Sequence, residues 1–521
     1  MTVYYCLGLL AVSLVAFSGV LNCGFIESYD DEMYITLNPV VSQGVTWEGV
    51  AWSFSTFVSG NWHPLTWWSH MLDVSLFGLR PAGHHAVNLC LHLANTILLF
   101  GVLARSTGRR GTSCFVAALF ALHPLHVESV AWVAERKDVL STLFGLAAIH
   151  AYLTYSASHA RRYFYYSLIL LCCSLMSKPM LVTFPLLLAV LDYWPLERDR
   201  CLPWRSLITE KLPLFVPVAA ISLLAVAAQE SAGALVSLAE ASPGSRILTA
   251  LNAYAVYVGK TFIPVNLASF YPYSPVPWYQ GCLAAGLLAA ASLVIWRLRQ
   301  NRRWLIAGWL WFLVALLPVI GLVRIGEQAY ADRYTYLALT GLGIIVAWGG
   351  DELLMARPWL KMALAAICVL LCGALTGMQV RFWENSESLY SREIAVSGQS
   401  WHGHFGLANE LAKRHEFDRA IEHYAAVLVT KPNSLDTLNN LGSSLRGAGR
   451  YREALPYFLK AVQAGPDYTL SYYNLALTLT DMGNRVGAED ALRQVLAIDP
   501  QFLQAQQLLD FLHNGNARGQ Q

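Results

Sequence analysis

Long apolar runs fill the first 380 residues, and they constrain the fold more than any other feature of the sequence. A membrane-spanning helix needs roughly 20 apolar residues, and eleven runs approach or reach that length. Charged residues make up only 13% of the chain, against about 25% in soluble proteins. We therefore predict an all-α, polytopic membrane domain over residues 1–380, and we exclude a disordered or wholly soluble chain. The predicted spans are 3–23, 84–104, 113–133, 138–156, 163–178, 179–195, 211–228, 281–297, 303–322, 334–350 and 360–379.

Basic residues between the runs predict the orientation, because lysine and arginine concentrate on the cytoplasmic side of membranes. Basic clusters follow the second, fourth and sixth predicted spans, at 105–110, 161–162 and 198–211. If these clusters are cytoplasmic, the N-terminus is cytoplasmic too, because an even number of spans separates it from each of them. The first run lacks a basic leader and a small-residue cleavage site, so we expect a retained span rather than a signal peptide.

The segment 246–264 carries Arg246, Asn252 and Lys260 and is ambiguous. As a twelfth span it would turn the basic cluster 297–303 outward, so we interpret it as an interfacial or re-entrant helix. This gives eleven spans and an outer C-terminus. The loop 24–83, the segment 229–280, the loop 323–333 and the C-terminal tail are then predicted on one outer face.

The tail repeats with a period of 34 residues, which is the spacing of tetratricopeptide repeats. Its sequence predicts a connecting helix at 383–400, repeats at 401–434, 435–468 and 469–502, and a capping helix with tail at 503–521. Small alanines let the paired helices approach, and a proline ends each second helix. The periodic residues are Ala420, Ala454 and Ala488, with Pro432, Pro466 and Pro500.

Such arrays form an α-solenoid with a concave groove that binds extended peptides. Asn440 and Asn474 share one repeat position, where an amide can pair with the backbone of an acceptor peptide. The alternative is that asparagine is merely common at this position. Gly406 stands there in the first repeat, which shortens the series.

Charge and cysteine content exclude several other classes of protein. The net charge of +2 gives no basic face for nucleic acid. The ten cysteines include no CxxC pair, so we predict neither a zinc site nor a disulfide framework. His123, His126 and Glu128 match no strong ligand spacing, and we expect no metal.

The outer loop 24–83 opens with three adjacent acids, Asp30, Asp31 and Glu32. Like charges side by side raise the pKa of at least one carboxyl group, which suits a general base. The alternative is a solvated acidic loop. The same loop carries five tryptophans, part of which we attribute to anchoring at the membrane interface.

Several cations are expected at the depth of this loop. Arginine and lysine at one level of a membrane face suggest an anionic ligand such as phosphate, while mutual salt bridges, for example with Asp332, are an equal alternative. Together with the acids they suit transfer of a sugar from a polyprenyl phosphate, because the cations stabilise the departing phosphate. The candidate phosphate-binding residues are Arg136, Lys137, Lys178, Arg324 and Arg333.

Five stretches resemble the transmembrane-and-tetratricopeptide-repeat (TMTC-type) O-mannosyltransferase family, and the resemblance covers nearly the whole chain. The family is similar to other GT-C glycosyltransferases, which use lipid-phosphate sugars and carry a catalytic acid in the first outer loop. The stretches are DDEMYI (30–35), NWHPLTWWSHMLD (61–73), FGLRPAGHHAVNLCLHLANTILLF (77–100), ALFALHPLHVESVAWVAERKDVLS (118–141) and ADRYTYLAL (331–339).

By this resemblance Asp30 or Asp31 is the catalytic acid, with Asp31 preferred. The resemblance implies a mannose-like sugar carried by a polyprenyl phosphate, a protein Ser or Thr acceptor held by the repeats, and no cofactor or metal. Three clear repeats are few for a eukaryotic member, so we expect a bacterial inner-membrane relative with its site on the periplasmic side; a eukaryotic member would face the lumen of the endoplasmic reticulum. The implied pocket residues are Glu32, His63, His84, His85, His123, His126, Glu128 and Asp332.

Two rival functions remain open from the sequence. The first is a lipid or polysaccharide glycosyltransferase, or an O-antigen-type ligase. The second is a membrane scaffold that displays the repeats and catalyses nothing.

Overall fold

The computed structural model describes residues 2–233, 242–324 and 326–517, which divide into two compact units. The first unit is Met1–Ser388 and the second is Leu389–Gln521, close to the boundary expected at 380. Among the described residues the regular structure is almost entirely helical. One short antiparallel pair joins β1 (Tyr271–Pro272) to β2 (Gln328–Tyr330). The predicted all-α class is confirmed.

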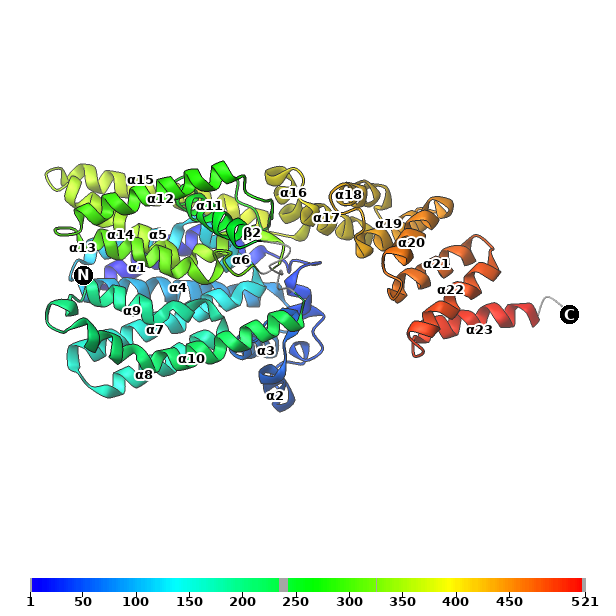
Figure 1. The fold of residues 1–521 in the computed structure, drawn as a ribbon, viewed down its shortest axis with the longest axis horizontal. Helices are drawn as coiled ribbons and strands as arrows, with labels where there is room; N and C mark the ends of the chain where they lie inside the picture. The colour runs from blue at the N-terminus through cyan, green and yellow to red at the C-terminus, as the bar shows by residue number, and fades with distance from the viewer. Residues whose placement is uncertain (1, 234–241, 325, 518–521) are drawn as a thin grey trace. The chain divides into compact units, whose positions relative to one another are not determined.

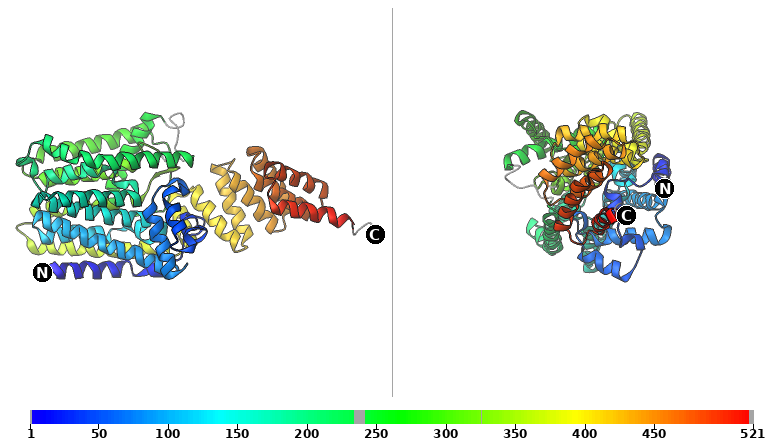
Figure 2. Two further views of the ribbon diagram at one scale, coloured as in Figure 1. Left: turned by 90° about the horizontal axis from the view of Figure 1, so that it is seen from below. Right: turned by 90° about the vertical axis from the view of Figure 1, so that its right-hand side faces the viewer.

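The long helices of the first unit lie side by side in a bundle, whereas α2 and α6 are short and α2 projects from it (Figures 1 and 2). The α-helices of this unit follow one another in chain order. They are α1 (Thr2–Ala16), α2 (Trp47–Ser55), α3 (Pro64–Phe77), α4 (Pro81–Thr107), α5 (Arg110–Leu122), α6 (Val127–Ala131), α7 (Arg136–Ser158), α8 (Arg161–Ser177), α9 (Phe184–Tyr193), α10 (Trp204–Ser231), α11 (Pro243–Phe262), α12 (Trp278–Leu298), α13 (Arg303–Leu316), α14 (Thr335–Leu353) and α15 (Pro358–Val380). The short helical turns between them are η1 (Ser18–Asn22), η2 (Glu32–Thr36), η3 (Val41–Gln43), η4 (Val58–Gly60), η5 (Pro124–His126), η6 (Val133–Glu135), η7 (Pro179–Thr183), η8 (Arg198–Arg200), η9 (Leu317–Val319), η10 (Asp332–Tyr334) and η11 (Arg381–Trp383).

Five helical segments of the described chain are long and apolar enough to cross a membrane, and a bent pair makes a sixth. The shorter apolar helices Thr2–Ala16, Pro179–Tyr193 and Arg303–Val319 coincide with three more predicted spans. The membrane character of the first unit agrees with the sequence, while the count of eleven spans stays a prediction. The five long segments are Pro81–Thr107, Val133–Ser158, Trp204–Ser231, Trp278–Leu298 and Pro358–Trp383.

The predicted span 113–133 is bent, with an angle of 53° between α5 and the helical segment that begins at Pro124. Proline has no N–H and disfavours helical geometry in the residue before it. His123 accordingly has extended backbone angles, with φ −75° and ψ 131°. The bend carries α6 and η6 away from the axis of α5. The Ala134 N–H of η6 then donates to Asp31 of the outer loop, and Glu128 of α6 pairs with Arg333.

Both ends of α11 approach one short segment of chain. Ser245, near its start, lies 3.3 Å from the Tyr273 hydroxyl, and Lys260, near its end, donates to the Tyr271 hydroxyl. Among the described residues, α11 is not one of the helices that combine the length and apolar character needed to cross a membrane. The interpretation of 246–264 as an interfacial or re-entrant helix stays a prediction.

The outer loop is folded rather than extended, and α2 and α3 give it a core. Thr46 caps α2 by accepting the Gly49 N–H at 3.0 Å, and a proline at the first position of α3 has the φ that a helix needs. Trp67 of α3 is fully buried, with its ring centroid 4.6 Å from that of Tyr34. Tyr34 lies one helical turn beyond Asp30 and Asp31, so this packing positions the acidic turn.

The chain leaves the first unit beside the acidic turn. The Gly24 N–H donates to the Glu384 carbonyl and the Glu27 N–H donates to the Ser386 hydroxyl, each at 2.8 Å. Residues 383–388 therefore lie at the same end of the bundle as the acids. The predicted orientation requires this arrangement.

The second unit consists of antiparallel helix pairs, as its 34-residue period predicts (Figure 1). The three periodic alanines are fully buried, and a Cβ added at Gly442 would lie 2.7 Å from the Phe458 ring, so only small residues fit where the helices cross. Residues 518–521 of the predicted tail lie outside the described residues. The helices are α16 (Ser386–Ser397), α17 (Trp401–Lys413), α18 (Phe417–Thr430), α19 (Leu435–Gly447), α20 (Tyr451–Ala464), α21 (Thr469–Asp481), α22 (Arg485–Ile498) and α23 (Leu503–Ala517).

Candidate functional site

The two aspartates of the acidic turn have different surroundings. Asp31 is 0% exposed, and its two carboxylate oxygens accept the backbone N–H groups of Ile26 and Ala134, each at 2.8 Å. Asp31 thereby ties the outer loop to η6. Asp30 keeps 28% of its side chain exposed and lies 3.6 Å from the Lys137 ammonium. Of the two carboxylates, that of Asp30 is the more exposed.

Burial raises the pKa of Asp31 from 3.8 to about 7, and the neighbouring Asp30 adds to the rise. The N–H donors of Ile26 and Ala134 and the charge of Lys137 favour the ionised form and offset part of it. The folded chain therefore holds a proton on Asp31 at pH values where the unfolded chain has lost it.

This raised pKa predicts a pH dependence of stability. The proton on Asp31 stabilises the fold fully below pH 3.8, and that stabilisation is lost as the pH rises through about 7. We expect the Tm of the wild-type protein to fall more steeply between about pH 5 and about pH 8 than that of Asp31→Asn, which does not titrate. Thermal unfolding in detergent at several pH values measures this difference, and parallel curves would contradict it.

Lys137 lies between the acidic turn and the interior of the bundle. Its ammonium is 3.1 Å from Glu135, 3.5 Å from the Tyr34 hydroxyl and 4.7 Å from the centre of the Tyr34 ring. The lysine side chain is 8% exposed. A cation held against an aromatic face and one exposed acid is suitably placed to meet an incoming anion.

Glu135 is the centre of the charged cluster, although the sequence did not single it out as a site residue. Its carboxylate is 2% exposed and lies 3.1 Å from Lys137, 2.9 Å from Lys178 and 3.3 Å from Arg333. Three of the predicted phosphate-binding cations, from α7, the turn before η7, and η10, therefore meet at one acid. A run of charged letters at 135–138 was the only signal for it in the sequence.

The cluster is close to electrical balance. Lys178 also binds Asp138 at 2.6 Å, and Arg333 also binds Glu128. Three cations thus face three buried acids, and Asp30 adds a fourth, more exposed one. A phosphate can bind here only by taking over contacts that carboxylates now make. These cations do form salt bridges, but Arg333 pairs with Glu128 and Glu135 rather than with Asp332, which was the example named from the sequence and which binds Lys260. Phosphate binding stays a prediction.

Arg136 points away from this cluster. Its guanidinium is fully buried and donates to Asp73 at 2.6 Å, to Ser69 at 2.7 Å and to the His84 carbonyl at 2.8 Å, and it also bonds Asn88. These bonds join α7 to α3 and α4. The arrangement favours a positioning role for Arg136 over direct contact with a donor phosphate.

The predicted pocket histidines are buried and mostly bonded to backbone or tyrosine. His63 is the closest to the cluster, with Nε2 3.0 Å from the Tyr34 hydroxyl, and burial together with Lys137 and Lys178 holds its pKa well below the ordinary value. His63 is therefore neutral. The others contact carbonyl groups: His84 that of Gly78, His85 that of Gly24, His123 that of Thr261, and His126 that of Phe120.

The remaining predicted residues of the first unit are Asp332, Arg324 and Glu32. Asp332 binds Lys260 at 2.9 Å and the Tyr271 hydroxyl at 2.9 Å, which joins α11 to η10. Arg324 lies 3.5 Å from the centre of the Tyr273 ring. Glu32 begins η2 and is half-buried.

In the second unit the predicted asparagines take part in an amide series. The Asn440 side chain donates to Asn409 at 3.2 Å, and that of Asn474 donates to Asn439 at 2.9 Å. Asn440 and Asn474 are both half-buried. Successive repeats thus carry linked amides, while peptide binding by them stays a prediction.

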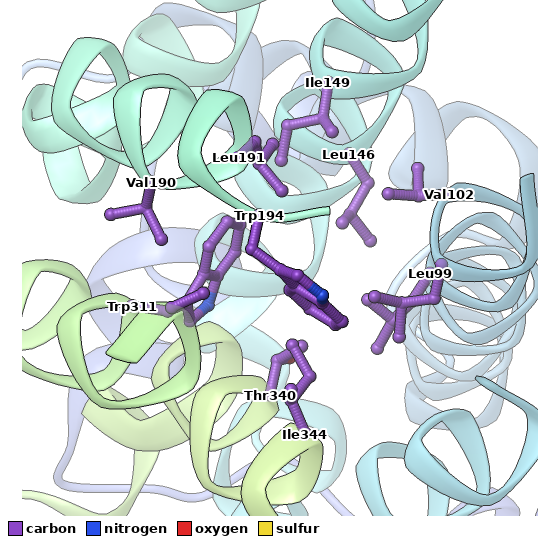
Figure 3. Close-up of a pocket in the computed structure, with 12 residues that line it drawn as sticks. Leu99, Val102, Leu146, Ile149, Val190, Leu191, Trp194, Trp311, Thr340 and Ile344 are labelled. Atoms are coloured by element: carbon purple, nitrogen blue, oxygen red, sulfur yellow. The ribbon is translucent and has the colours of Figure 1, made fainter. Parts of the chain in front are cut away.

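Two cavities follow one another along the same helices. The first adjoins the cluster and is lined by Asp138 and Arg333, with Leu181, Ala315 and Leu337 further in. The second is apolar, and in Figure 3 the side chains of Trp194, Trp311 and Leu99 converge on it. Helices α7, α13 and α14 line both cavities. On each helix, the residues that line the second cavity lie one or two turns away from the residues that line the first. The other residues that line the second cavity are Val102, Leu103, Leu146, Ile149, Val190, Leu191, Ala307, Thr340 and Ile344.

The described residues also contain one group of possible metal ligands that lie close together. It consists of His70, Asp73 and His84. From the sequence we expected no metal, on the spacing of His123, His126 and Glu128, and the group at α3 and α4 was not considered. Of the three, only His84 was named as a site residue.

Residues 433–501 match the tetratricopeptide repeat family. The human protein O-mannosyl-transferase TMTC1 is 24% identical over 443 residues, which cover 74% of this chain and 50% of the relative. Mouse protein O-mannosyl-transferase TMTC3 is 22% identical over 560 residues, covering 95% of this chain and 60% of the relative. The chain thus spans about half the length of these relatives.

Among solved structures, the crystal structure of MamA is 20% identical, with a TM-score of 0.25, and covers 25% of this chain and 77% of that one.

The fly protein O-mannosyl-transferase Tmtc1 is 30% identical over 192 residues, which cover 36% of this chain and 22% of the relative. This chain is therefore similar in sequence to the TMTC protein O-mannosyl-transferases, and helices long and apolar enough to cross a membrane precede its tetratricopeptide array.

Proposed function

We propose that this protein is a GT-C-type membrane glycosyltransferase that moves a mannose-like monosaccharide from a polyprenyl phosphate to a Ser or Thr hydroxyl of a protein. One observation supports this most strongly. An exposed carboxylate, Asp30, lies 3.6 Å from Lys137, and Lys137 shares Glu135 with two further cations. A base and an electrophilic surface for phosphate are thus adjacent.

The transfer step uses these groups as follows. The acceptor hydroxyl oxygen attacks the anomeric carbon while Asp30 accepts its proton. The bond between that carbon and the phosphate oxygen breaks, and the phosphate leaves with the electron pair. Lys137 and Arg333 stabilise the charge that develops on the phosphate. A single displacement inverts the sugar carbon, and no metal takes part.

We place the lipid part of the donor along α7, α13 and α14. These helices line both the cavity at Asp138 and Arg333 and the apolar cavity of Figure 3. An isoprenoid tail pointing that way would leave its phosphate at the charged end. This supports a lipid-linked donor over a nucleotide sugar, whose second half is charged and polar.

The repeats are proposed to recruit the protein acceptor through their linked amides. Replacing both Asn440 and Asn474 with alanine should lower acceptor labelling by about 30-fold, since each lost hydrogen bond costs about 1 kcal/mol. The matched control is Asn433→Ala, an exposed asparagine outside the series. Labelling of a Ser/Thr-rich acceptor protein by the full chain measures the effect, and equal labelling by all variants would contradict it.

Transfer itself is tested in membranes that contain the full chain and a polyprenyl-phosphate mannose carrying a label. We expect label on protein that mild alkali releases by β-elimination, as for sugars on Ser or Thr. Label in the lipid fraction alone would favour the lipid or polysaccharide transferase. Absence of label, with full biological activity in an Asp30→Asn variant, would favour the scaffold. The proposed setting is a bacterial inner membrane with the site outward, or the endoplasmic reticulum with the site in the lumen.

A further inference from the structure

Three possible metal ligands converge where α3 meets α4. His70 and Asp73 lie one turn apart on α3, and His84 lies in the first turn of α4. One ligand atom from each lies within 4.8 Å of the others, and no side chain of the three is more than 2% exposed. The junction joins the outer loop to the bundle.

The hydrogen bonding of this group is incomplete. Neither ring nitrogen of His70 has a partner, and His70 is 0% exposed. His84 Nε2 lies 3.0 Å from the Gly78 carbonyl oxygen, which can only accept, so Nε2 carries the hydrogen. In neutral His84 the lone pair of Nδ1 then faces the Asp73 carboxylate oxygen at 3.4 Å. Two acceptors facing one another without a proton repel, and leaving such groups unsatisfied in a buried site costs about 1–3 kcal/mol each.

We propose that a divalent transition-metal cation of the zinc type binds His70, Asp73 and His84 and fastens α3 to α4. Two ligands at about 2.1 Å from a tetrahedral zinc ion lie about 3.4 Å apart, which is the separation of His84 Nδ1 and the Asp73 oxygen. The bond from His84 Nε2 to Gly78 fixes the tautomer that presents Nδ1 to a metal. His70 completes the set with a nitrogen that otherwise has no partner.

Arg136 sets the character of this site. It donates to the same Asp73 oxygen at 2.6 Å, so the carboxylate bridges a guanidinium and the cation, and its charge is shared. Affinity is therefore lower than in a closed four-ligand zinc site, and a water or hydroxide takes the fourth position. The cation is structural and does not enter the sugar-transfer step, so this inference stands independently of the proposed function.

Binding of Co²⁺ to the purified full chain tests the site directly. After treatment with a chelator, we expect one Co²⁺ per chain with the visible absorption of four-coordinate cobalt, and displacement by Zn²⁺. Zn²⁺ should raise the Tm and the chelator should lower it. His70→Gln and His84→Gln should abolish both effects, whereas His159→Gln, at an exposed turn, should keep them.

A wild-type chain that gains no cobalt absorption, and whose Tm responds to neither Zn²⁺ nor chelator, would overturn the proposal. Because no sugar transfer is measured, failure here is distinct from failure of the proposed function. The wild-type measurements also decide the matter if the histidine variants do not fold.

Discussion

Replacing Asp30 with asparagine is expected to lower the rate of sugar transfer by about 10²–10⁴-fold, which is the usual contribution of a general base. Asparagine keeps the size of the side chain but cannot accept the hydroxyl proton. Since 28% of the Asp30 side chain is exposed and it makes no bond that holds the loop to η6, the fold should persist. The initial rate of protein labelling measures the loss of sugar transfer, and the Tm measures whether the fold persists.

The matched control is Glu48→Gln, which removes an exposed acid of the same outer loop and should leave transfer unchanged. Asp31→Asn gives the decisive contrast. Its carboxylate accepts two backbone N–H groups, so its loss should lower the Tm as well as the rate. Full transfer by Asp30→Asn with none by a stably folded Asp31→Asn would make Asp31 the base.

Replacing Lys137 with methionine is expected to lower transfer by about 10²–10³-fold, the effect of removing one preorganised group that stabilises developing negative charge. Methionine keeps the packing against the Tyr34 ring, 4.7 Å from the ammonium, but supplies no charge to the departing phosphate. The loss should appear mainly in kcat, with a smaller rise in the KM for the donor. Steady-state kinetics with a labelled polyprenyl-phosphate sugar separate the two.

Lys137→Arg should recover part of the activity, since it restores a cation at the same place. Lys361→Gln is the matched control, because this lysine is 40% exposed and pairs with Asp351 in a separate ion pair. If Lys137→Met retained the wild-type kcat, Lys137 would have no part in stabilising the leaving group. An equal loss in Lys361→Gln would point to a general effect of charge on folding.

The repeats were predictable because their packing demands small residues at a fixed period. Ala420, Ala454 and Ala488 are fully buried at the helix crossings where the sequence placed them. The apolar runs likewise predicted the helices, since an apolar run of that length can adopt few structures other than a helix. The proline at position 124 is present in the sequence, but the 53° angle between the two helical segments depends on how the helices pack, which one apolar run cannot reveal.

The site was predictable in part. The sequence named three cations that the fold brings together, Lys137, Lys178 and Arg333, yet it missed Glu135, which joins them. Residues 135–138 are adjacent in the chain, but they begin a helix and so point in different directions. Arg136 therefore turns to Asp73, while its neighbours turn to the cluster. Sequence order cannot reveal such a division.

The preference for Asp31 over Asp30 shows the same limit. Adjacent acids look alike in a sequence, and only the fold shows that backbone N–H groups occupy both oxygens of Asp31. The choice of Asp30 as base is a proposal drawn from that difference in exposure and partners.

A structure of the full chain with a polyprenyl-phosphate mannose bound tests the central claim most directly. We predict the phosphate within hydrogen-bonding distance of Lys137 and Arg333, the lipid along α7, α13 and α14, and the Asp30 carboxylate beside the anomeric carbon. A phosphate bound at the opposite end of the bundle, for example at Arg303, or a sugar out of reach of Asp30, would contradict the account.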